Sequence, residues 1–212
     1  MEPLIIAVAN LKGGTGKTTS TAYLAQAFRE LEKTVLIVDA DPQESIKEWA
    51  ELSAWSVPTV ALPSKLMHRN LNGIHRGRYD VVLIDTPPFY PRSKDEAEKP
   101  PPGIVHSALK SADLVVVPMA ATLMEYRRVA PTLNAIATAG RPDQDVTFLL
   151  NRAVNNAGST DAVRALLVGS GHRVFASAIP RLESVAQSFA APVTGNLHGY
   201  LSAAIEILES AK

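Results

Sequence analysis

Short, uninterrupted runs of apolar residues recur along the chain. They cover residues 4–9, 34–39, 80–85, 113–118 and 145–150, with a weaker sixth run at 173–179. The runs are rich in Val, Ile and Leu and do not alternate with polar residues. This pattern predicts strands that are covered on both faces, as in a parallel sheet.

Between these runs, apolar residues recur at helical spacing. Amphipathic helices are predicted at residues 16–31, 123–140, 160–171 and 197–211. Gly140 is expected at the C′ position of the second of these helices, and Pro131 is expected to kink it. The strand–helix alternation predicts a doubly wound, mostly parallel α/β sheet with helices on both faces and ligands at the carboxyl ends of the strands.

The composition favours one domain that spans residues 1–212. The chain has 212 residues, of which 46% are apolar, and these are sufficient for one core. It has no cysteine, which excludes disulfides, thiolate zinc sites and cysteine nucleophiles. Because 21 basic and 21 acidic residues cancel, binding to nucleic acid or anionic lipid would need a local patch.

The first residues do not resemble a targeting segment. The apolar run 4–9 has no basic residues before it and is too short for a signal peptide. No stretch approaches the ~20 apolar residues that span a bilayer. We therefore expect a cytoplasmic protein. Because the first apolar run already begins at residue 4, we also expect no separate N-terminal DNA-binding domain.

A charged, proline-rich segment at residues 89–103 interrupts the alternation. Its composition is typical of a solvated surface loop. Because it follows the acidic end of the run 80–85, a mobile lid or a partner-binding loop is the alternative.

The stretch NLKGGTGKTT, residues 10–19, has the composition of a phosphate-binding loop. Glycines let backbone N–H groups approach phosphates, and the helix that follows adds its positive N-terminal end. Lys17 would contact the β- and γ-phosphates, and the Thr18 hydroxyl would bind Mg²⁺.

Carboxylates follow two of the predicted strands. Asp39 and Asp41 lie in VDADPQ, and Asp85 lies in VVLIDTPP, at the end of its apolar run. Beside a phosphate loop, such groups are suited to hold Mg²⁺ through its waters and to position an attacking water.

The loop departs from the common pattern G-x-x-x-x-G-K-[ST], because Leu11 replaces the first glycine and Lys12 adds a second lysine. This form, KGGTGKT, resembles the deviant Walker A loop of the ParA/MinD group of P-loop ATPases. The resemblance implies that Lys12 reaches across a homodimer interface to the partner's nucleotide. The ATP contacts expected in the loop are Lys12, Gly13, Gly14, Thr15, Gly16, Lys17, Thr18 and Thr19.

The same resemblance assigns roles to the acids. DADPQ resembles switch I, in which Asp41 would position or activate water and Asp39 would support the magnesium shell. DTPP resembles Walker B with switch II, which places Asp85 on the magnesium side with Thr18. Lys12, Lys17 and Asp41 are therefore the expected catalytic residues.

Two further positions are expected to line the adenine. Asn151 and Arg152 follow one strand, and Pro180 and Arg181 follow the next apolar run. An amide can read the adenine edge because it carries both a donor and an acceptor. The resemblance, which covers residues 5–193, implies this pocket, and the absence of an NKxD motif favours ATP over GTP. Both arginines could instead be surface charges.

Within the group, a compact partition ATPase is the favoured interpretation. It would dimerise on ATP, bind DNA without sequence preference at the nucleoid, and respond to a ParB-like centromere-binding adaptor. Arg152, Arg164, Arg173 and Arg181 are the candidate DNA contacts, with His172 nearby, and scattered surface charges are the alternative.

Other members of the group fit less well. A membrane-associated, MinD-like regulator would need a basic amphipathic C-terminal helix, whereas residues 197–212 contain two glutamates and one terminal lysine, as expected of a packing helix. A reductase like nitrogenase iron protein would need cysteines to hold its cluster. A nucleotide-dependent regulator or scaffold with negligible turnover stays open, because binding and hydrolysis use the same residues.

Overall fold

The computed structural model describes residues 2–74, 77–89, 103–154 and 158–211. The predicted loop at 89–103 falls outside the described residues except for its two ends. At those ends, Phe89 is buried, and Gly103 begins a helix.

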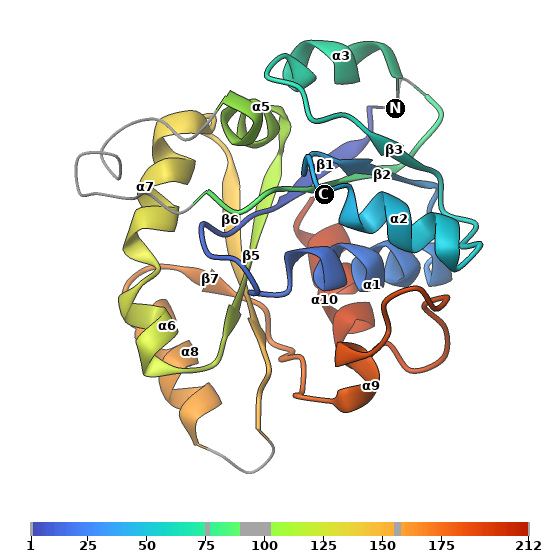
Figure 1. Ribbon diagram of the computed structural model, residues 1–212. Coiled ribbons are helices and arrows are strands. Elements are labelled where there is room, and N and C mark those ends of the chain that lie inside the picture. The colour runs from blue at the N-terminus through green and yellow to red at the C-terminus, as the bar shows by residue number, and fades with distance from the viewer. Residues whose placement is uncertain (1, 75–76, 90–102, 155–157, 212) are drawn as a thin grey trace.

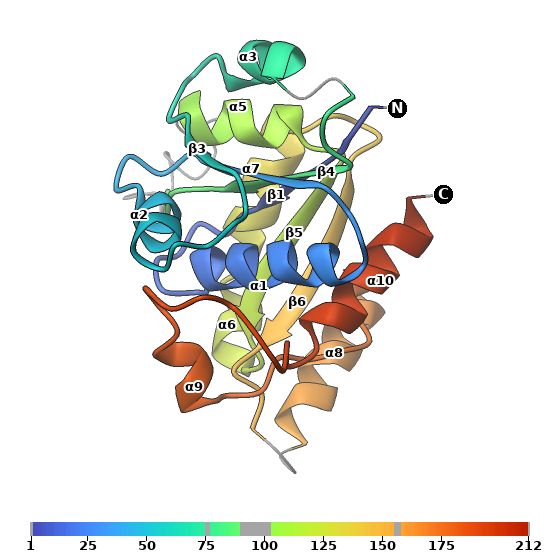
Figure 2. The ribbon, with the colours of Figure 1, turned by 90° about the vertical axis from the view of Figure 1, so that its right-hand side faces the viewer.

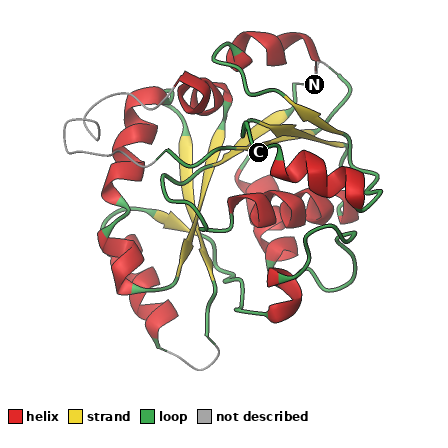
Figure 3. Ribbon diagram, viewed as in Figure 1, coloured by secondary structure: helices red, strands yellow, loops and turns green. Residues whose placement is uncertain are grey.

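The described residues form a seven-stranded, all-parallel sheet (Figure 3). The strand order is β3-β2-β4-β1-β5-β6-β7, which confirms the predicted doubly wound arrangement. The strands are β1 (Leu4–Val8), β2 (Val35–Asp39), β3 (Thr59–Ala61), β4 (Val81–Asp85), β5 (Leu114–Ala120), β6 (Asp145–Asn151) and β7 (Arg173–Val174).

The central strands are buried on both faces because successive side chains point to opposite sides of the sheet. In β1, Ile6 and Val8 contribute to one core cluster, whereas Ala7 and the following Ala9 contribute to the other. This double burial explains the continuous apolar runs in the sequence.

Helices cover each face of the sheet (Figures 1 and 2). One core cluster includes residues of α1 (Lys17–Glu30), α2 (Ser45–Leu52) and α10 (Tyr200–Ser210). The other includes residues of α3 (Met67–Ile74), α5 (Gly103–Ser111), α7 (Ala130–Ala139) and α8 (Ser159–Gly169). Two short helices, α6 (Leu123–Arg127) and α9 (Glu183–Ala186), lie near the carboxyl end of the sheet.

The predicted C-terminal packing helix is confirmed. In α10, Tyr200, Ala203 and Ile207 are buried in the same core cluster as residues of α1. The Tyr200 hydroxyl lies 3.2 Å from the hydroxyl of Ser20 on α1. Across the described residues, no helix has the length and apolar character that a membrane span requires.

Two elements differ from the sequence prediction. The helix predicted at 123–140 is two helices, because α6 ends at Arg127 and α7 begins at Ala130. Pro131 lies in the first turn of α7, where its missing N–H removes no helical hydrogen bond, so it begins a helix instead of kinking one. The strand predicted at 173–179 is only β7, Arg173–Val174.

Five short elements were not predicted: α2, β3, α3, α5 and α9. The longest of them, α5, has nine residues, and several are largely polar. Segments this short carry too few periodic positions for the apolar pattern to reveal them.

Gly140 directly follows α7, but as the C-cap residue and not at the predicted C′ position. Its backbone is extended, with φ −74° and ψ 179°, and not left-handed as is usual at C′. A Cβ at this position would lie 2.8 Å from the Ile136 carbonyl oxygen and would also overlap the Gln144 side chain. The position therefore needs glycine because of close packing.

We predict that Gly140→Ala lowers the free energy of unfolding by about 1–3 kcal/mol, the typical cost of overpacking. Gly169→Ala in α8 is the matched control, because a Cβ there meets nothing within 4 Å and the helix favours alanine. Urea denaturation of both variants measures the difference. Equal stabilities would contradict the close-packing explanation.

Candidate nucleotide-binding site

The candidate site lies where the central strands end. β4 pairs with both β1 and β2, so that Asp85 is in register with Val8 and with Asp39. The phosphate loop leaves β1 at the point where the strand order reverses, between β4 and β5. Parallel α/β sheets bind their ligands at such a point.

Glycines shape the turn from β1 into α1. Gly14 and Gly16 have φ values of 69° and 87°, in the left-handed region that favours glycine. Gly16 directly precedes α1, and a Cβ there would lie 3.0 Å from the Asn151 amide nitrogen. The loop therefore ends at the positive N-terminus of a fourteen-residue helix.

Three side chains hold the carbonyl groups of this loop. The Lys17 ammonium donates to the Lys12 carbonyl at 3.1 Å, Arg152 donates to Gly14 at 2.6 Å, and Asn151 donates to Thr15 at 2.7 Å. In a trans peptide the N–H points away from the C=O. Fixing the carbonyls therefore orients the next N–H groups, as an anion site requires.

The two lysines of the loop have opposite surroundings. Lys17 is 7% exposed, and burial lowers the pKa of its ammonium, although the nearby carboxylates of Asp85 and Asp41 act against this shift. The Lys12 side chain is 41% exposed and forms an ion pair with Glu125 of α6. Lys17 therefore lies within its own loop, whereas Lys12 is directed away from it.

Asp85 is buried at the end of β4 beside the helix α1. One carboxylate oxygen accepts a hydrogen bond from the Thr18 hydroxyl at 2.7 Å, and the other lies 3.4 Å from the Thr21 hydroxyl. Burial raises the pKa of the Asp85 carboxyl to about 7, and the Thr18 hydrogen bond offsets part of this rise. A cation at this position would compensate the buried charge.

Asp39 and Asp41 have different environments. Asp39 is fully buried, and its carboxylate accepts the backbone N–H groups of Asp41 at 3.0 Å and Lys47 at 3.1 Å. Burial raises the pKa of Asp39. Asp41 is half-buried and lines a cavity of about 290 Å³ together with Lys17 and Thr18. Asp39 thus shapes the segment that brings Asp41 to the phosphate loop.

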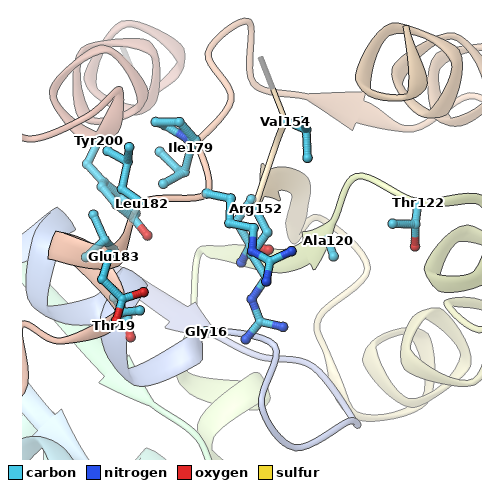
Figure 4. Close-up of a pocket in the computed structure, with 15 residues that line it drawn as sticks. Gly16, Thr19, Ala120, Thr122, Arg152, Val154, Ile179, Leu182, Glu183 and Tyr200 are labelled. Carbon is cyan, nitrogen blue, oxygen red and sulfur yellow. The ribbon is translucent and has the colours of Figure 1, made fainter. Parts of the chain in front are cut away.

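A larger cavity of about 700 Å³ adjoins the first (Figure 4). It is lined by Asn151, Pro180 and Arg181, as predicted, and by Tyr200. The bridge between Ala153 and Pro180 brings the two predicted segments together. Within the described chain, the buried Oδ1 of Asn151 has no hydrogen-bond partner, which is uncommon for a buried polar atom.

Comparison with known proteins agrees with this arrangement. The family model of the CobQ/CobB/MinD/ParA nucleotide-binding domain matches residues 6–192. The chain belongs to the CobQ/CobB/MinD/ParA family.

Relatives of this family member have different biological roles. Maintenance of carboxysome distribution protein A from Gloeobacter kilaueensis is 42% identical over 87 residues, which are 41% of this chain and only 39% of that relative. Protein ParA from Rhizobium radiobacter is 25% identical over 219 residues, covering 97% of this chain and 93% of that protein.

Solved structures share the fold. Cobyrinic acid a,c-diamide synthase from Mycobacterium smegmatis, crystallised with an ATP analogue and magnesium, has a TM-score of 0.74. It is 23% identical, and the match covers 99% of this chain and 96% of that chain. At this identity the likeness supports the P-loop fold of the CobQ/CobB/MinD/ParA family and not a shared reaction.

The four arginines predicted to contact DNA occupy different parts of this family member. Arg152 and Arg181 line the larger cavity at the carboxyl end of the sheet. Arg164 donates to the Phe175 carbonyl from α8, and Arg173 pairs with Asp145 at the start of β6, with 3.2 Å between the charged atoms. The described chain therefore does not gather the four at one place.

Several residues of the site were not predicted. Asn10 is buried and bonds the Pro118 carbonyl at 2.9 Å, the Lys12 N–H at 3.1 Å and, more weakly, Thr132. The sequence did offer a signal for Asn10, because it is a polar residue directly after the apolar run 4–9. Glu125 is 113 positions from Lys12, and nothing in the sequence pattern links the two.

We predict that Asp85→Asn stabilises the nucleotide-free protein at pH 7. With a pKa of about 7 in the fold, Asp85 keeps a proton that the unfolded chain releases near pH 4. The wild type therefore loses stability as the pH rises from about 4 to 7, by up to ~4 kcal/mol, and the variant lacks this loss. Denaturant unfolding across this pH range measures the difference.

Asp80→Asn is the control with the opposite sign. The backbone N–H and hydroxyl of Thr34 lower the pKa of Asp80, so its charge stabilises the fold above pH ~4 and this contribution disappears in acid. A parallel pH profile for wild type and Asp85→Asn would contradict the buried, protonated Asp85.

Proposed function

We propose that this chain is a magnesium-dependent ATPase of the partition type. ATP binding would bring two copies together, the dimer would hold DNA without sequence preference, and a partner protein would stimulate hydrolysis and release. The resemblance to ParA/MinD ATPases and the full-length match to ParA support this cycle.

The observation that carries the proposal is the opposite orientation of the two lysines. The Lys17 ammonium is bound inside its own loop. Lys12 therefore has a different role from that of a second cation pointing into the same loop. Lys12 stands at the loop mouth with 41% of its side chain exposed. A cation in this position suits a nucleotide bound by a facing copy, where it would stabilise charge on the phosphates in trans.

The residues of the two cavities suit ATP. The unpaired Oδ1 of Asn151 would accept from the adenine amino group, and the loop N–H groups would hold the phosphates. Thr18 and Asp85 would hold Mg²⁺, which prefers oxygen ligands and retains several waters. Magnesium would supply charge neutralisation between the phosphates. The related M. smegmatis enzyme was crystallised with an ATP analogue and magnesium.

Asp41 would direct the hydrolytic water. Its carboxylate lines the smaller cavity, and Asp39 holds its backbone N–H at 3.0 Å. The water would form a bond to the γ-phosphorus while the bond to the β–γ bridging oxygen breaks, giving ADP and phosphate. Lys17, with Lys12 of the second copy, would stabilise the charge that develops.

Only two of the four candidate arginines would contact DNA in this proposal. Arg152 and Arg181 line the cavity for the nucleotide, so Arg164 and Arg173 are better placed to contact DNA. The Arg173 side chain is about half exposed and its ion pair with Asp145 is a surface pair, which costs little to exchange for a phosphate contact.

A second candidate function is the positioning of a protein cargo. It is favoured by the 42% identity with a carboxysome distribution protein over 87 residues. Both functions use the same ATP cycle and differ in the adaptor and the cargo. A regulator that binds ATP without turnover is the third alternative.

Sedimentation with non-specific DNA in the presence of ATP, ADP or a non-hydrolysable analogue tests the proposal. We predict ATP-dependent dimers that bind DNA, and an Asp41→Ala variant that binds ATP, hydrolyses it slowly and accumulates as dimers. Lys17→Ala should bind no ATP. DNA binding that ignores the nucleotide, or normal turnover by Asp41→Ala, would contradict the proposed cycle.

We predict that the Lys12–Glu125 pair opposes dimerisation, because Lys12 must leave Glu125 to reach a second copy. Glu125→Gln should strengthen the ATP-dependent dimer by about 2- to 5-fold per subunit, the worth of a partly exposed ion pair. Lys12→Ala should bind ATP as a monomer. Analytical ultracentrifugation measures both effects.

Glu51→Gln is the matched control, since Glu51 forms an exposed ion pair with Lys47 on α2. It should leave the dimer unchanged. ATP-dependent dimers of Lys12→Ala at wild-type strength would rule out the role of Lys12 in trans.

A further inference from the structure

Arg152 has a strained backbone directly after β6. Its φ is 51°, in the left-handed region that residues with a Cβ rarely adopt. The segment is held in place because the Ala153 N–H donates to Ile179 at 3.0 Å and the Arg181 N–H donates to Ala153 at 2.9 Å. Such strain persists where the surrounding structure fixes it, and it concentrates at functional sites.

The strained backbone directs the Arg152 side chain to the phosphate loop. Its Nη2 donates to the Gly14 carbonyl at 2.6 Å, and Figure 4 shows the side chain central among the residues that line the larger cavity. Only Gly16, Thr19 and Arg152 line both cavities among the described residues. Arg152 is the one charged residue of these three.

The smaller cavity needs more positive charge than Lys17 supplies. Lys17 and Arg152 are the cations in its described lining, and Asp41 is also present there. Lys12 is paired with Glu125 and is absent from this lining. A bound triphosphate carries about four negative charges, of which Mg²⁺ and Lys17 together would offset about three, so one further cation would complete the compensation.

Arg152 also has donors to spare. A guanidinium carries five N–H donors in a rigid fork that matches phosphate oxygens. Within the described residues, the bond to Gly14 is the only hydrogen bond found for this side chain. The remaining donors are therefore available to a ligand in either cavity.

We propose that Arg152 contacts the phosphate chain of the bound nucleotide within its own subunit, and so serves as a charge-supplying residue and not as part of the adenine wall. This inference rests on the proposed nucleotide-binding function. It makes the monomer competent to bind the triphosphate before Lys12 of a second copy arrives. It also gives a reason to keep arginine at a position whose backbone favours glycine.

The experiment compares the affinities of wild type, Arg152→Gln, Arg152→Lys and Arg152→Gly for ATP, ADP and AMP with magnesium. Calorimetry is done at concentrations at which the protein is monomeric, and the Tm of each variant is recorded. We expect Arg152→Gln to lose about 10- to 100-fold in ATP affinity, as for a hydrogen bond to a charged group, less for ADP and least for AMP.

The other variants separate charge from fold. Arg152→Lys retains the charge and should recover part of the ATP affinity. Arg152→Gly relieves the left-handed strain, so its Tm should be equal to or above that of wild type while its ATP affinity falls. Arg181 lines only the larger cavity. Any loss of affinity in Arg181→Gln should therefore be the same for all three nucleotides.

Three outcomes would overturn the inference. The first is an unchanged ATP affinity in Arg152→Gln. The second is an equal loss of affinity for AMP, ADP and ATP in that variant. The third is a loss of ATP affinity in all three Arg152 variants together with a fall in Tm. The second would indicate an adenine contact, and the third would indicate that Arg152 only braces the loop. If Lys17→Ala binds ATP as well as wild type, the proposed function itself fails, whatever Arg152 does.

Discussion

The site depends on the orientation of a few peptide groups in the loop after β1. Lys17, Asn151 and Arg152 each bind one carbonyl of this loop, which also fixes the orientation of the N–H group on the opposite side of each peptide. Two of these three side chains come from the end of β6, more than 130 positions away. The sheet therefore acts as the frame that fixes the anion-binding geometry, because it holds β1 and β6 at a set distance on either side of β5.

Several ionisable groups are buried at the same edge of the sheet, where a ligand of opposite charge would stabilise their charged forms. Asp39 and Asp85 are paired in register at the ends of β2 and β4, and both are buried. Burial raises the pKa of both carboxyls and lowers that of the Lys17 ammonium, so burial disfavours the charged form of each of these groups. Magnesium with a polyphosphate would bring the counter-charges that these groups lack. Under the proposed function, nucleotide binding would therefore stabilise the fold through the same residues.

The end of β6 lies between the two cavities that the proposed function assigns to the base and to the phosphates. Asn151 holds the loop with its amide nitrogen and also lines the larger cavity, and its buried Oδ1 has no hydrogen-bond partner among the described residues. Arg152 follows it and lines both cavities.

The sequence by itself determined the parallel sheet and the residues of the loop and strand ends, because continuous apolar runs and closely spaced motifs are local properties of the chain. Lys17, Thr18, Asp41 and Asp85 could be found in this way. It could not predict the split at Pro131, the short elements α2 and α3, or the separation of Arg164 and Arg173 from the nucleotide cavity. Only the tertiary structure decided that Lys12 faces Glu125 and that Arg152 reaches Gly14. The physical reason is that such contacts join segments more than 100 positions apart, and the strand order, not local spacing, brings them together.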